Sequence, residues 1–213
     1  MNPERSLFID GPAGRIESMF REPAEGAPGA ALILHPHPLY GGNLHNKVVF
    51  TVQKVLGAAG MATLRMNFRG VGASEGSYDD GVGEQQDLLA ALAHLAEAAP
   101  GLPLYLAGFS FGAWLSLKTG AEDERVAAMI SLGTPVGWGD MSYLRGCDMP
   151  RFFIHGTVDE FCDAQSLAVE YEGLPEPKRL AWIEGADHFF TGKLEELAAR
   201  LEEAVSFLRD PRA

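Results

Sequence analysis

Short apolar runs alternate with longer amphipathic stretches along most of the chain. Apolar runs bounded by turn residues are typical of strands, whereas apolar residues spaced three or four positions apart are typical of helices. The predicted strands are residues 6–10, 16–21, 30–34, 62–68, 104–107, 126–132, 151–155 and 178–184. The predicted helices are residues 46–59, 83–98, 164–172 and 193–208, with a further buried helix running on from residue 113.

The order of these elements indicates the fold class. From residue 30 onward strands and helices alternate, which predicts right-handed βαβ units and a mostly parallel sheet with helices on both faces. The first two strands are joined by a tight turn at residues 11–14, and we expect them to form an antiparallel edge. We therefore predict a single α/β domain spanning residues 1–213, with a sheet of about seven to eight strands.

The composition is that of a globular protein with an acidic surface. The chain has 213 residues, of which 46% are apolar and 22% are charged, and its formal net charge is −12. This length suits one well-filled domain, and the negative charge disfavours nucleic acid and anionic membranes as partners. Since no apolar run approaches the length of a membrane span, we expect no membrane partner either. The oligomeric state stays open between a monomer and a homodimer.

The two cysteines, Cys147 and Cys162, lack the spacing of metal-binding motifs. Residues 1–5 do not resemble the start of a secretory signal peptide. We therefore expect a cytoplasmic protein with free thiols, no metal and no cofactor.

One glycine-rich motif has the surroundings that a catalytic serine needs. Residues 108–112, Gly-Phe-Ser-Phe-Gly, lie between the apolar run at residues 104–107 and the helix that follows. Strand, Gly-x-Ser-x-Gly and helix are the context of a nucleophile elbow, in which glycines let backbone segments pass close to a serine in a strained turn. The N-terminus of the helix would favour negative charge developing there. The pattern predicts Ser110 as the nucleophile.

A second Gly-x-Ser-x-Gly motif, at residues 72–76, lacks this context. Three residues separate it from the preceding predicted strand, and turn-forming residues follow it instead of a helix. Its Glu75 would also place a carboxylate where an oxyanion must be received. We therefore interpret Ser74 as a serine of a surface loop.

A serine hydroxyl is a poor nucleophile until a base removes its proton. Among the six histidines, His188 is the best placed, because it lies in the loop after the predicted strand 178–184, and this loop is long enough to reach toward Ser110. The other histidines have structural interpretations as capping, packing or loop-shaping residues: His35, His37, His45, His94 and His155.

The base needs an acidic residue that fixes its tautomer and stabilises its positive charge. Asp159 follows the predicted strand 151–155 and should lie at the same end of the sheet, and serine, acid, base is a known triad order along a chain. Asp163 is the near alternative, although its position suits a helix N-cap. Asp187 adjoins His188 and is badly placed to face its imidazole.

The oxyanion formed on attack needs two N–H donors. One is expected from the backbone of Phe111, directly after the nucleophile, and the other from the loop after residues 30–34. The prolines of that loop have no N–H to donate, which leaves His37, Leu39 and Tyr40. Of these we favour the backbone N–H of His37.

These segments together resemble the alpha/beta hydrolase superfamily over roughly residues 30 to 208. The matching motifs, in the family's order, are His35-Pro36-His37-Pro38, Asn67-Phe68-Arg69-Gly70-Val71-Gly72-Ala73-Ser74, Gly108-Phe109-Ser110-Phe111-Gly112, His155-Gly156-Thr157-Val158-Asp159 and Gly185-Ala186-Asp187-His188. More narrowly, the chain resembles a small bacterial branch of lidless serine hydrolases near the dienelactone hydrolases, although Ser110 stands where those enzymes carry cysteine. The resemblance implies a Ser-Asp-His triad, esterase or thioesterase activity, and a second glycine loop that contains no nucleophile.

No cap domain is expected over the site, because residues 133–150 are predicted to form a loop with one helical turn near Met141. We therefore expect an open, shallow site. The aromatic residues that could line it, or could equally pack in the core, are Tyr40, Phe109, Trp138, Phe161 and Phe189.

The expected activity is hydrolysis of a small-molecule carboxylic ester or thioester through an acyl-enzyme on Ser110. An acyltransferase or a peptidase would use the same three side chains. A non-catalytic ligand-binding module on the same fold is the alternative from another class. The complete set of Ser110, Asp159 and His188 argues against that alternative, since a scaffold has no need of all three.

Overall fold

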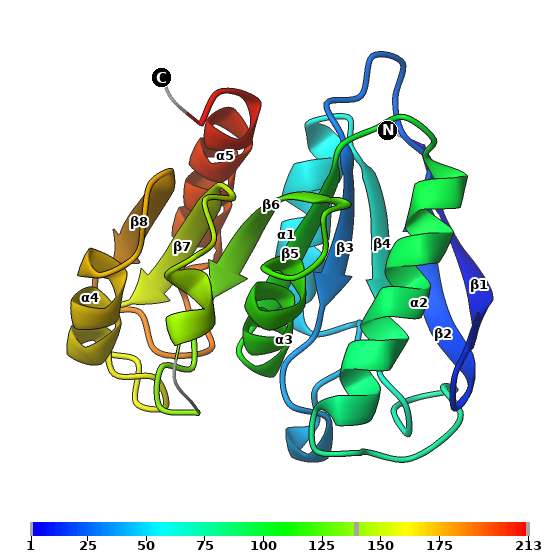
Figure 1. The fold of residues 1–213 in the computed structure, drawn as a ribbon, viewed down its shortest axis with the longest axis horizontal. Helices are drawn as coiled ribbons and strands as arrows, with labels where there is room; N and C mark the ends of the chain where they lie inside the picture. The colour runs from blue at the N-terminus through cyan, green and yellow to red at the C-terminus, as the bar shows by residue number, and fades with distance from the viewer. Residues whose placement is uncertain (1, 139–140, 212–213) are drawn as a thin grey trace.

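The computed structural model describes residues 2–138 and 141–211 (Figure 1). The strands are β1 (Glu4–Gly11), β2 (Gly14–Arg21), β3 (Ala30–Leu34), β4 (Ala62–Met66), β5 (Leu104–Phe109), β6 (Val126–Leu132), β7 (Arg151–Gly156) and β8 (Lys178–Ile183). The helices are α1 (Lys47–Ala58), α2 (Val82–Ala98), α3 (Phe111–Gly120), α4 (Ala164–Glu172) and α5 (Leu194–Arg209), with 3-10 turns η1 (Pro38–Tyr40) and η2 (Ser142–Leu144). None of the described helices combines the length and the apolar character that crossing a membrane requires.

The strands of the described chain form one sheet in the order β1-β2-β4-β3-β5-β6-β7-β8. The strands from β3 to β8 pair in parallel, whereas β1 and β2 form a hairpin that pairs antiparallel with β4. The predicted mostly parallel α/β sheet with an antiparallel edge is therefore confirmed.

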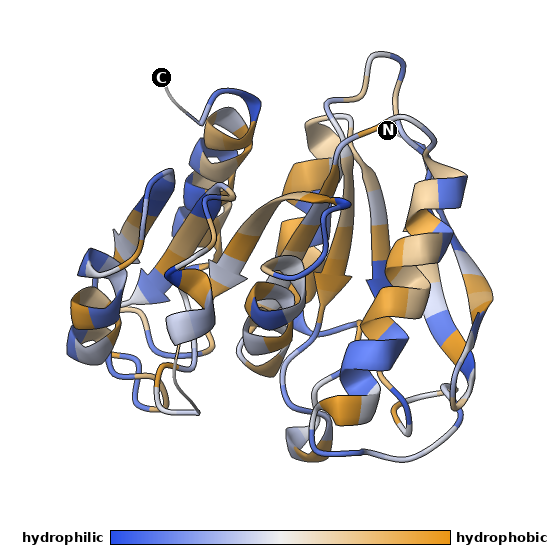
Figure 2. Cartoon of the chain, in the orientation of Figure 1, coloured by the Kyte–Doolittle hydropathy of each residue, from blue (hydrophilic) through white to orange (hydrophobic). Residues whose placement is uncertain are grey.

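Hydrophobic cores lie on both faces of the sheet. Helices α1 and α5 cover one face, and α2, α3 and α4 cover the other (Figure 1). Strands β3 and β5 are buried along their whole length, which explains why their sequences are continuously apolar instead of alternating. Figure 2 shows hydrophobic residues concentrated in these central strands.

Strand β4 ends at Met66, earlier than the apolar run predicts. The N–H of Asn67 donates to Glu17 O at 2.9 Å, and the N–H of Phe68 donates to the imidazole Nε2 of His35 at 3.1 Å. Asn67 still bonds to β2, whereas Phe68 bonds to a side chain just beyond the end of β3 instead of to a neighbouring strand, so the ladder ends here.

The segment between β6 and β7 is short, as predicted. Its helical turn near Met141 is the 3-10 turn η2, while residues 139 and 140 of the predicted loop lie outside the described residues. In the part of this segment that the structure describes, no helix is added that would cap the sheet.

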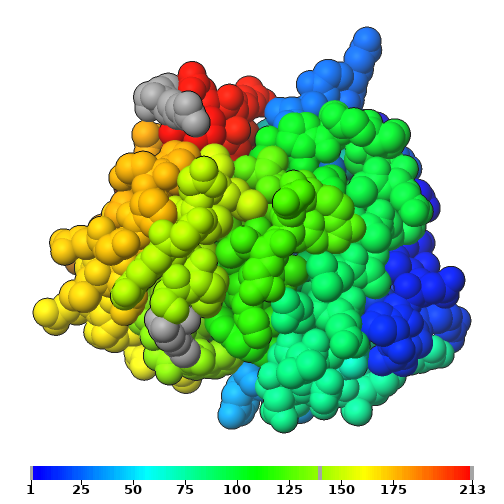
Figure 3. Space-filling view, viewed as in Figure 1, coloured from blue at the N-terminus to red at the C-terminus, as the bar shows by residue number. Residues whose placement is uncertain are grey.

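The carboxyl ends of the parallel strands point toward the lower side of the molecule in Figure 1, and the loops that follow them lie below the sheet. The turn η1 protrudes from this edge in the space-filling view of Figure 3. In open α/β sheets the loops at this edge carry the ligand sites, so the candidate residues are expected here.

Candidate active site

Ser110 lies in the turn between β5 and α3, where the backbone is strained. Its φ and ψ angles are 55° and −114°, a region that residues with a side chain rarely adopt. Two glycines permit this turn, since a Cβ atom on Gly108 would lie 2.1 Å from Gly112 O, and one on Gly112 would lie 2.6 Å from Leu34 O. The N–H of Ser110 donates to Leu132 O at 2.9 Å. These contacts fix Ser110 at the carboxyl edge of the sheet.

His188 lies in the loop between β8 and α5, and its Nε2 is 3.0 Å from Ser110 Oγ. The loop is joined to the loop after β7, because the N–H of Val158 donates to Ala186 O at 3.1 Å. A Cβ atom on Gly156 would lie 2.2 Å from the same oxygen, so the two loops pack without space for a side chain there. The structure thus brings the predicted base to the predicted nucleophile across 78 positions of sequence.

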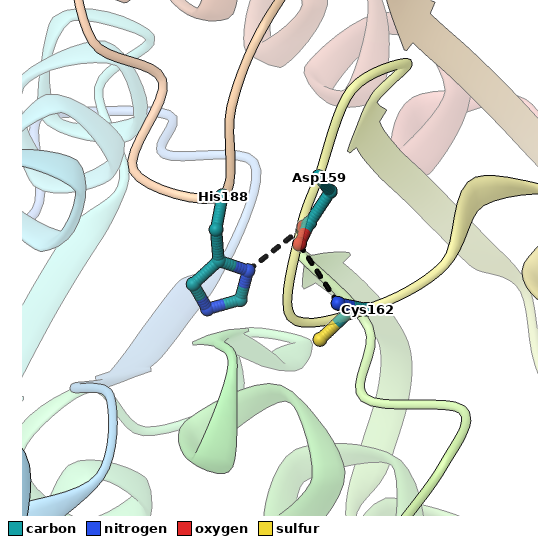
Figure 4. Close-up of side chains that lie close together, drawn as sticks. All are labelled: Asp159, Cys162 and His188. Atoms are coloured by element: carbon teal, nitrogen blue, oxygen red, sulfur yellow. Dashed lines mark hydrogen bonds and ion pairs between the residues drawn. The ribbon is translucent and has the colours of Figure 1, made fainter.

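Asp159, in the loop after β7, is hydrogen-bonded to the other ring nitrogen of His188. Its Oδ2 accepts from His188 Nδ1 at 2.8 Å (Figure 4), and its Oδ1 accepts from the N–H groups of Phe161 at 2.9 Å and Cys162 at 2.8 Å. Burial alone would raise the pKa of Asp159, but the hydrogen bond from His188 and the charge that this imidazole can carry lower the pKa below its usual value. An ionised Asp159 holds the His188 proton on Nδ1, which leaves the Nε2 lone pair for the Ser110 hydroxyl.

His155, at the end of β7, supports the loop that carries Asp159. Its Nε2 donates to Cys162 O at 2.6 Å and lies 3.5 Å from Asp159 Oδ2. Burial lowers the pKa of His155, so its ring is neutral at pH 7. This placement fits the interpretation of His155 as a structural histidine.

The two alternative acids lie in local turns. Asp163 is the N-cap of α4, and its Oδ2 accepts from the N–H of Ser166 at 2.7 Å. Asp187 Oδ1 accepts from the N–H of Thr191 at 2.8 Å. Within the described residues, neither carboxylate is hydrogen-bonded to the His188 imidazole.

Ser74 is buried, so its interpretation as a surface-loop serine is wrong. Its Oγ donates to Asn67 O at 2.8 Å and accepts from the N–H of Glu17 at 2.9 Å. The neighbouring Glu75 side chain bonds to Arg15 on β2. The glycine loop folds back over the β1–β2 hairpin, a long-range contact that local sequence does not reveal.

Of the three N–H groups that the loop after β3 is expected to offer to an oxyanion, two are already bonded. The N–H of Leu39 donates to His37 Nδ1 at 3.2 Å, and the N–H of Tyr40 donates to His37 O at 3.1 Å. The N–H groups of His37 and Phe111 have no acceptor among the described residues. The rings of these two residues lie 5.1 Å apart, so both predicted donors belong to one corner of the site.

A cleft of about 370 Å³ opens beside Ser110. The residues that line it are Pro36, His37, Tyr40, Gly41, Gly42, Asn46, Ser110, Trp138, Phe161, Cys162, His188 and Phe189. The prediction that Phe109 lines the site is wrong, because this residue ends β5 and points into the core under α1 and α5, where its ring lies 5.0 Å from that of His188. The other predicted aromatic residues do lie along the cleft.

Three side chains in this corner have the chemistry of metal ligands. Ligand atoms of Asp159, Cys162 and His188 all lie within 4.8 Å of one another (Figure 4). However, both Asp159 oxygens already accept hydrogen bonds, and burial raises the pKa of the Cys162 thiol to about 12. A thiolate, which a metal would require, is therefore disfavoured at neutral pH. We interpret the group as part of the hydrogen-bonded arrangement around His188.

Comparison with known proteins identifies the family. The model of the alpha/beta hydrolase domain matches residues 30–206. The chain belongs to the alpha/beta hydrolase family. Among solved structures, a serine hydrolase without a lid from Xanthomonas campestris is 34% identical to this alpha/beta hydrolase, with a TM-score of 0.88 and coverage of 97% of this chain and 95% of that chain. An alpha-beta serine hydrolase homologue from Coxiella burnetii is 37% identical, with a TM-score of 0.89 and coverage of 96% and 98%.

A curated relative of this alpha/beta hydrolase is an uncharacterized protein of Rickettsia prowazekii. It is 36% identical over 206 residues, which are 92% of this chain and 87% of that protein. The similarity to the lidless Xanthomonas structure agrees with the short β6–β7 connection. The predicted resemblance to a small lidless alpha/beta hydrolase is therefore confirmed.

Proposed function

We propose that this protein is a serine hydrolase that cleaves small carboxylic esters or thioesters through an acyl-enzyme on Ser110. The observation that carries the proposal is the unbroken series of hydrogen bonds from Ser110 Oγ to His188 Nε2, at 3.0 Å, and from His188 Nδ1 to Asp159 Oδ2, at 2.8 Å. Ser110 and His188 line the cleft on the carboxyl edge of the sheet, where a substrate carbonyl can reach Ser110, and Asp159 is buried behind them.

In the first half of the reaction, Ser110 Oγ attacks the carbonyl carbon while His188 Nε2 takes the hydroxyl proton. Asp159 stays ionised and stabilises the imidazolium. The N–H groups of Phe111 and His37 receive the oxyanion of the tetrahedral intermediate. When this intermediate collapses, the bond from the carbonyl carbon to the leaving oxygen or sulfur breaks, and His188 gives its proton to the leaving alcohol or thiol.

In the second half, water takes the place of the leaving group. His188 removes one proton from the water as its oxygen attacks the acyl carbon, and the same two N–H groups receive the new oxyanion. Collapse releases the carboxylic acid and returns the proton to Ser110. The open cleft gives water direct access to the acyl-enzyme.

The lining of the cleft favours an uncharged acyl group. Among its described residues there is no lysine, arginine or carboxylate, whereas aromatic rings come from Tyr40, Trp138, Phe161 and Phe189. A volume of about 370 Å³ is near the lower end of the range for small-molecule pockets. These features support small esters and thioesters over peptides with charged ends.

We further propose that the reaction takes place in the cytoplasm. Cys147 and Cys162 are both buried free thiols, which is typical of a reducing compartment. The net charge of −12 supports a small neutral molecule as the substrate in preference to nucleic acid or an anionic membrane surface.

A fluorophosphonate probe, combined with hydrolysis of p-nitrophenyl acetate and butyrate, tests the proposal on the wild type and Ser110→Ala. We expect labelling and turnover in the wild type and the loss of both in Ser110→Ala. Ser206→Ala, on the exposed face of α5, is the matched control and should behave as the wild type. A folded wild type that takes no label would overturn the proposal in favour of a ligand-binding module.

A further inference from the structure

The loop between β4 and α2, residues 67–81, contains the Arg-Gly-x-Gly-x-Ser motif, which the proposed reaction does not use. Its first part is fixed to α2 by Arg69. The N–H and Nε of Arg69 donate to Asp87 Oδ2 at 3.0 and 2.9 Å, and Nη2 donates to Oδ1 at 2.7 Å. Because Asp87 is buried, this bidentate ion pair is shielded from competing water and holds the loop firmly.

The last part of the same loop is fixed by Glu84. This carboxylate is completely buried, and its oxygens accept from the N–H of Asp79 at 2.9 Å and of Gly81 at 2.8 Å. Tyr78 directly precedes the segment that Glu84 holds. Buried ion-pair and carboxylate contacts on both sides therefore restrict where the Tyr78 side chain can lie.

Tyr78 uses its hydroxyl to contact the loop after β3. Its Oη lies 3.2 Å from His37 Nε2. Since His37 Nδ1 already accepts from the N–H of Leu39, the neutral imidazole carries its proton on Nε2 and donates it to Tyr78. Burial lowers the pKa of His37, although Glu84 and Asp80 oppose this, so the ring is neutral at pH 7. The imidazole thus links its own loop to Tyr78.

The ring of Tyr78 contacts both residues whose N–H groups are free in the site. Its centroid lies 5.1 Å from that of His37 and 6.1 Å from that of Phe111. His37 O also accepts from the N–H groups of Tyr40, at 3.1 Å, and Gly42, at 3.1 Å, which limits rotation of the peptide group between His37 and Pro38. The backbone of His37 is therefore restrained by the η1 turn on one side and by Tyr78 on the other.

We propose that Tyr78 is a positioning residue for the oxyanion site: its hydroxyl, bonded to His37, and its ring, packed against Phe111, hold the two N–H donors where the transition state needs them. The inference rests on the proposed function. Oxyanion donors act because they are already in place when charge develops, so a small displacement costs rate without preventing substrate binding. In this proposal the β4–α2 loop, which carries the second Gly-x-Ser-x-Gly motif, keeps the two N–H donors in position.

Tyr78→Phe tests the proposal, because it removes the hydroxyl and keeps the ring. We expect kcat for p-nitrophenyl butyrate to fall about tenfold, the effect of one lost hydrogen bond at this site, with KM changed by less than about twofold. The dissociation constant of phenylboronic acid, which forms a tetrahedral adduct on a reactive serine, should rise by about the same factor. The midpoint of thermal unfolding checks that the variant is folded.

Tyr105→Phe is the matched control, since its hydroxyl donates to Pro28 O at 3.3 Å, far from the cleft. It should leave kcat and boronate binding unchanged. Unaltered kcat and boronate binding in Tyr78→Phe would overturn the positioning role, as would a change in KM alone. Residual turnover by Ser110→Ala in the same assay would instead contradict the proposed function, so the two failures are distinguishable.

Discussion

His188 Nδ1 lies 2.8 Å from Asp159 Oδ2, and the two residues follow neighbouring parallel strands, β8 and β7. Parallel neighbours end at the same edge of a sheet, so the loops that follow them meet without a long detour of the chain. Ser110 reaches the same edge from β5, with β6 between β5 and β7. The arrangement of the three side chains is thus a consequence of sheet topology.

Asp159→Asn should lower kcat by about four orders of magnitude while the fold is kept. The amide oxygen can still accept from the N–H groups of Phe161 and Cys162, as Oδ1 does now. Its NH2 group would face His188 Nδ1, however, and would favour the tautomer that leaves no acceptor for the Ser110 proton. Steady-state kinetics and circular dichroism provide the measurement.

Asp163→Asn is the control for this prediction. The N-cap of α4 is tolerant of asparagine, so activity should stay within about twofold of the wild type. If Asp163→Asn abolished activity while Asp159→Asn did not, Asp159 would not be the acid of the triad.

Ser74→Ala should retain activity and lose stability. The Ser74 hydroxyl is buried and bonded to Asn67 O and to the N–H of Glu17, so its removal leaves one buried and one half-buried backbone group without this partner. We expect a loss of about 1–3 kcal/mol in the free energy of unfolding, measured by urea denaturation. Loss of fluorophosphonate labelling in a folded Ser74→Ala variant would contradict the choice of Ser110 as the nucleophile.

Phe161→Ala should affect longer acyl groups more than acetate. Its exposed ring borders the cleft, 5.2 Å from the ring of His188 and 5.8 Å from that of Phe189. We expect kcat/KM for p-nitrophenyl hexanoate to fall roughly five- to tenfold, the effect of about 1 kcal/mol of lost apolar contact, with acetate nearly unchanged. Phe8→Ala, on strand β1 away from the cleft, is the control and should show no difference between the two esters. Equal losses for both esters in Phe161→Ala would argue against binding of the acyl group beside Phe161.

Stability should decrease as the pH falls from 7 to 5, in part because of His35. Burial lowers the pKa of His35 from 6.5 to about 4. Between these values the unfolded chain binds a proton that the native chain does not, so the contribution of His35 to stability is complete above pH 6.5 and is lost as the pH falls toward 4. Urea denaturation at both pH values should give a loss of about 2 kcal/mol from this residue.

His35→Gln removes this titration while its amide oxygen can still accept from the N–H of Phe68, as His35 Nε2 does. The variant should lose about 2 kcal/mol less than the wild type between pH 7 and pH 5. An equal loss in the two proteins would mean that other groups account for the acid sensitivity.

The fold could be predicted more completely from sequence than the lining of the site. Continuous apolar runs such as Ala30–Leu34 mark buried parallel strands, and the alternation of elements leaves few topologies to consider. The meeting of Ser110, His188 and Asp159 follows from the same topology, since each comes after a parallel strand. Their catalytic roles stay a prediction until the variants above are assayed.

Side-chain direction and long-range contact were beyond local reasoning. Phe109 enters the core because it ends β5, whereas its neighbour Ser110 faces the cleft, and no pattern separates adjacent residues in a strained turn. Cys162 and Asn46 line the cleft, although the sequence pattern does not predict this. Cys162 follows β7 and Asn46 precedes α1, so their position at the carboxyl edge of the sheet was the signal that could have found them. The contact of Tyr78 with His37 depends on how the whole β4–α2 loop folds, which local sequence does not reveal.

Strand β8, which leads to His188, is the last strand of the sheet and has a neighbour on one side, β7. Edge elements exchange their amide hydrogens through local openings that need less free energy than global unfolding, whereas the Ser110 turn lies on a central strand. Loss of the His188 contacts through local opening and global unfolding of the chain are therefore separate events that involve different parts of the sheet. An engineer who wishes to extend the working lifetime of this enzyme should reinforce the β8 edge and the packing of α5 against it before altering the already buried centre.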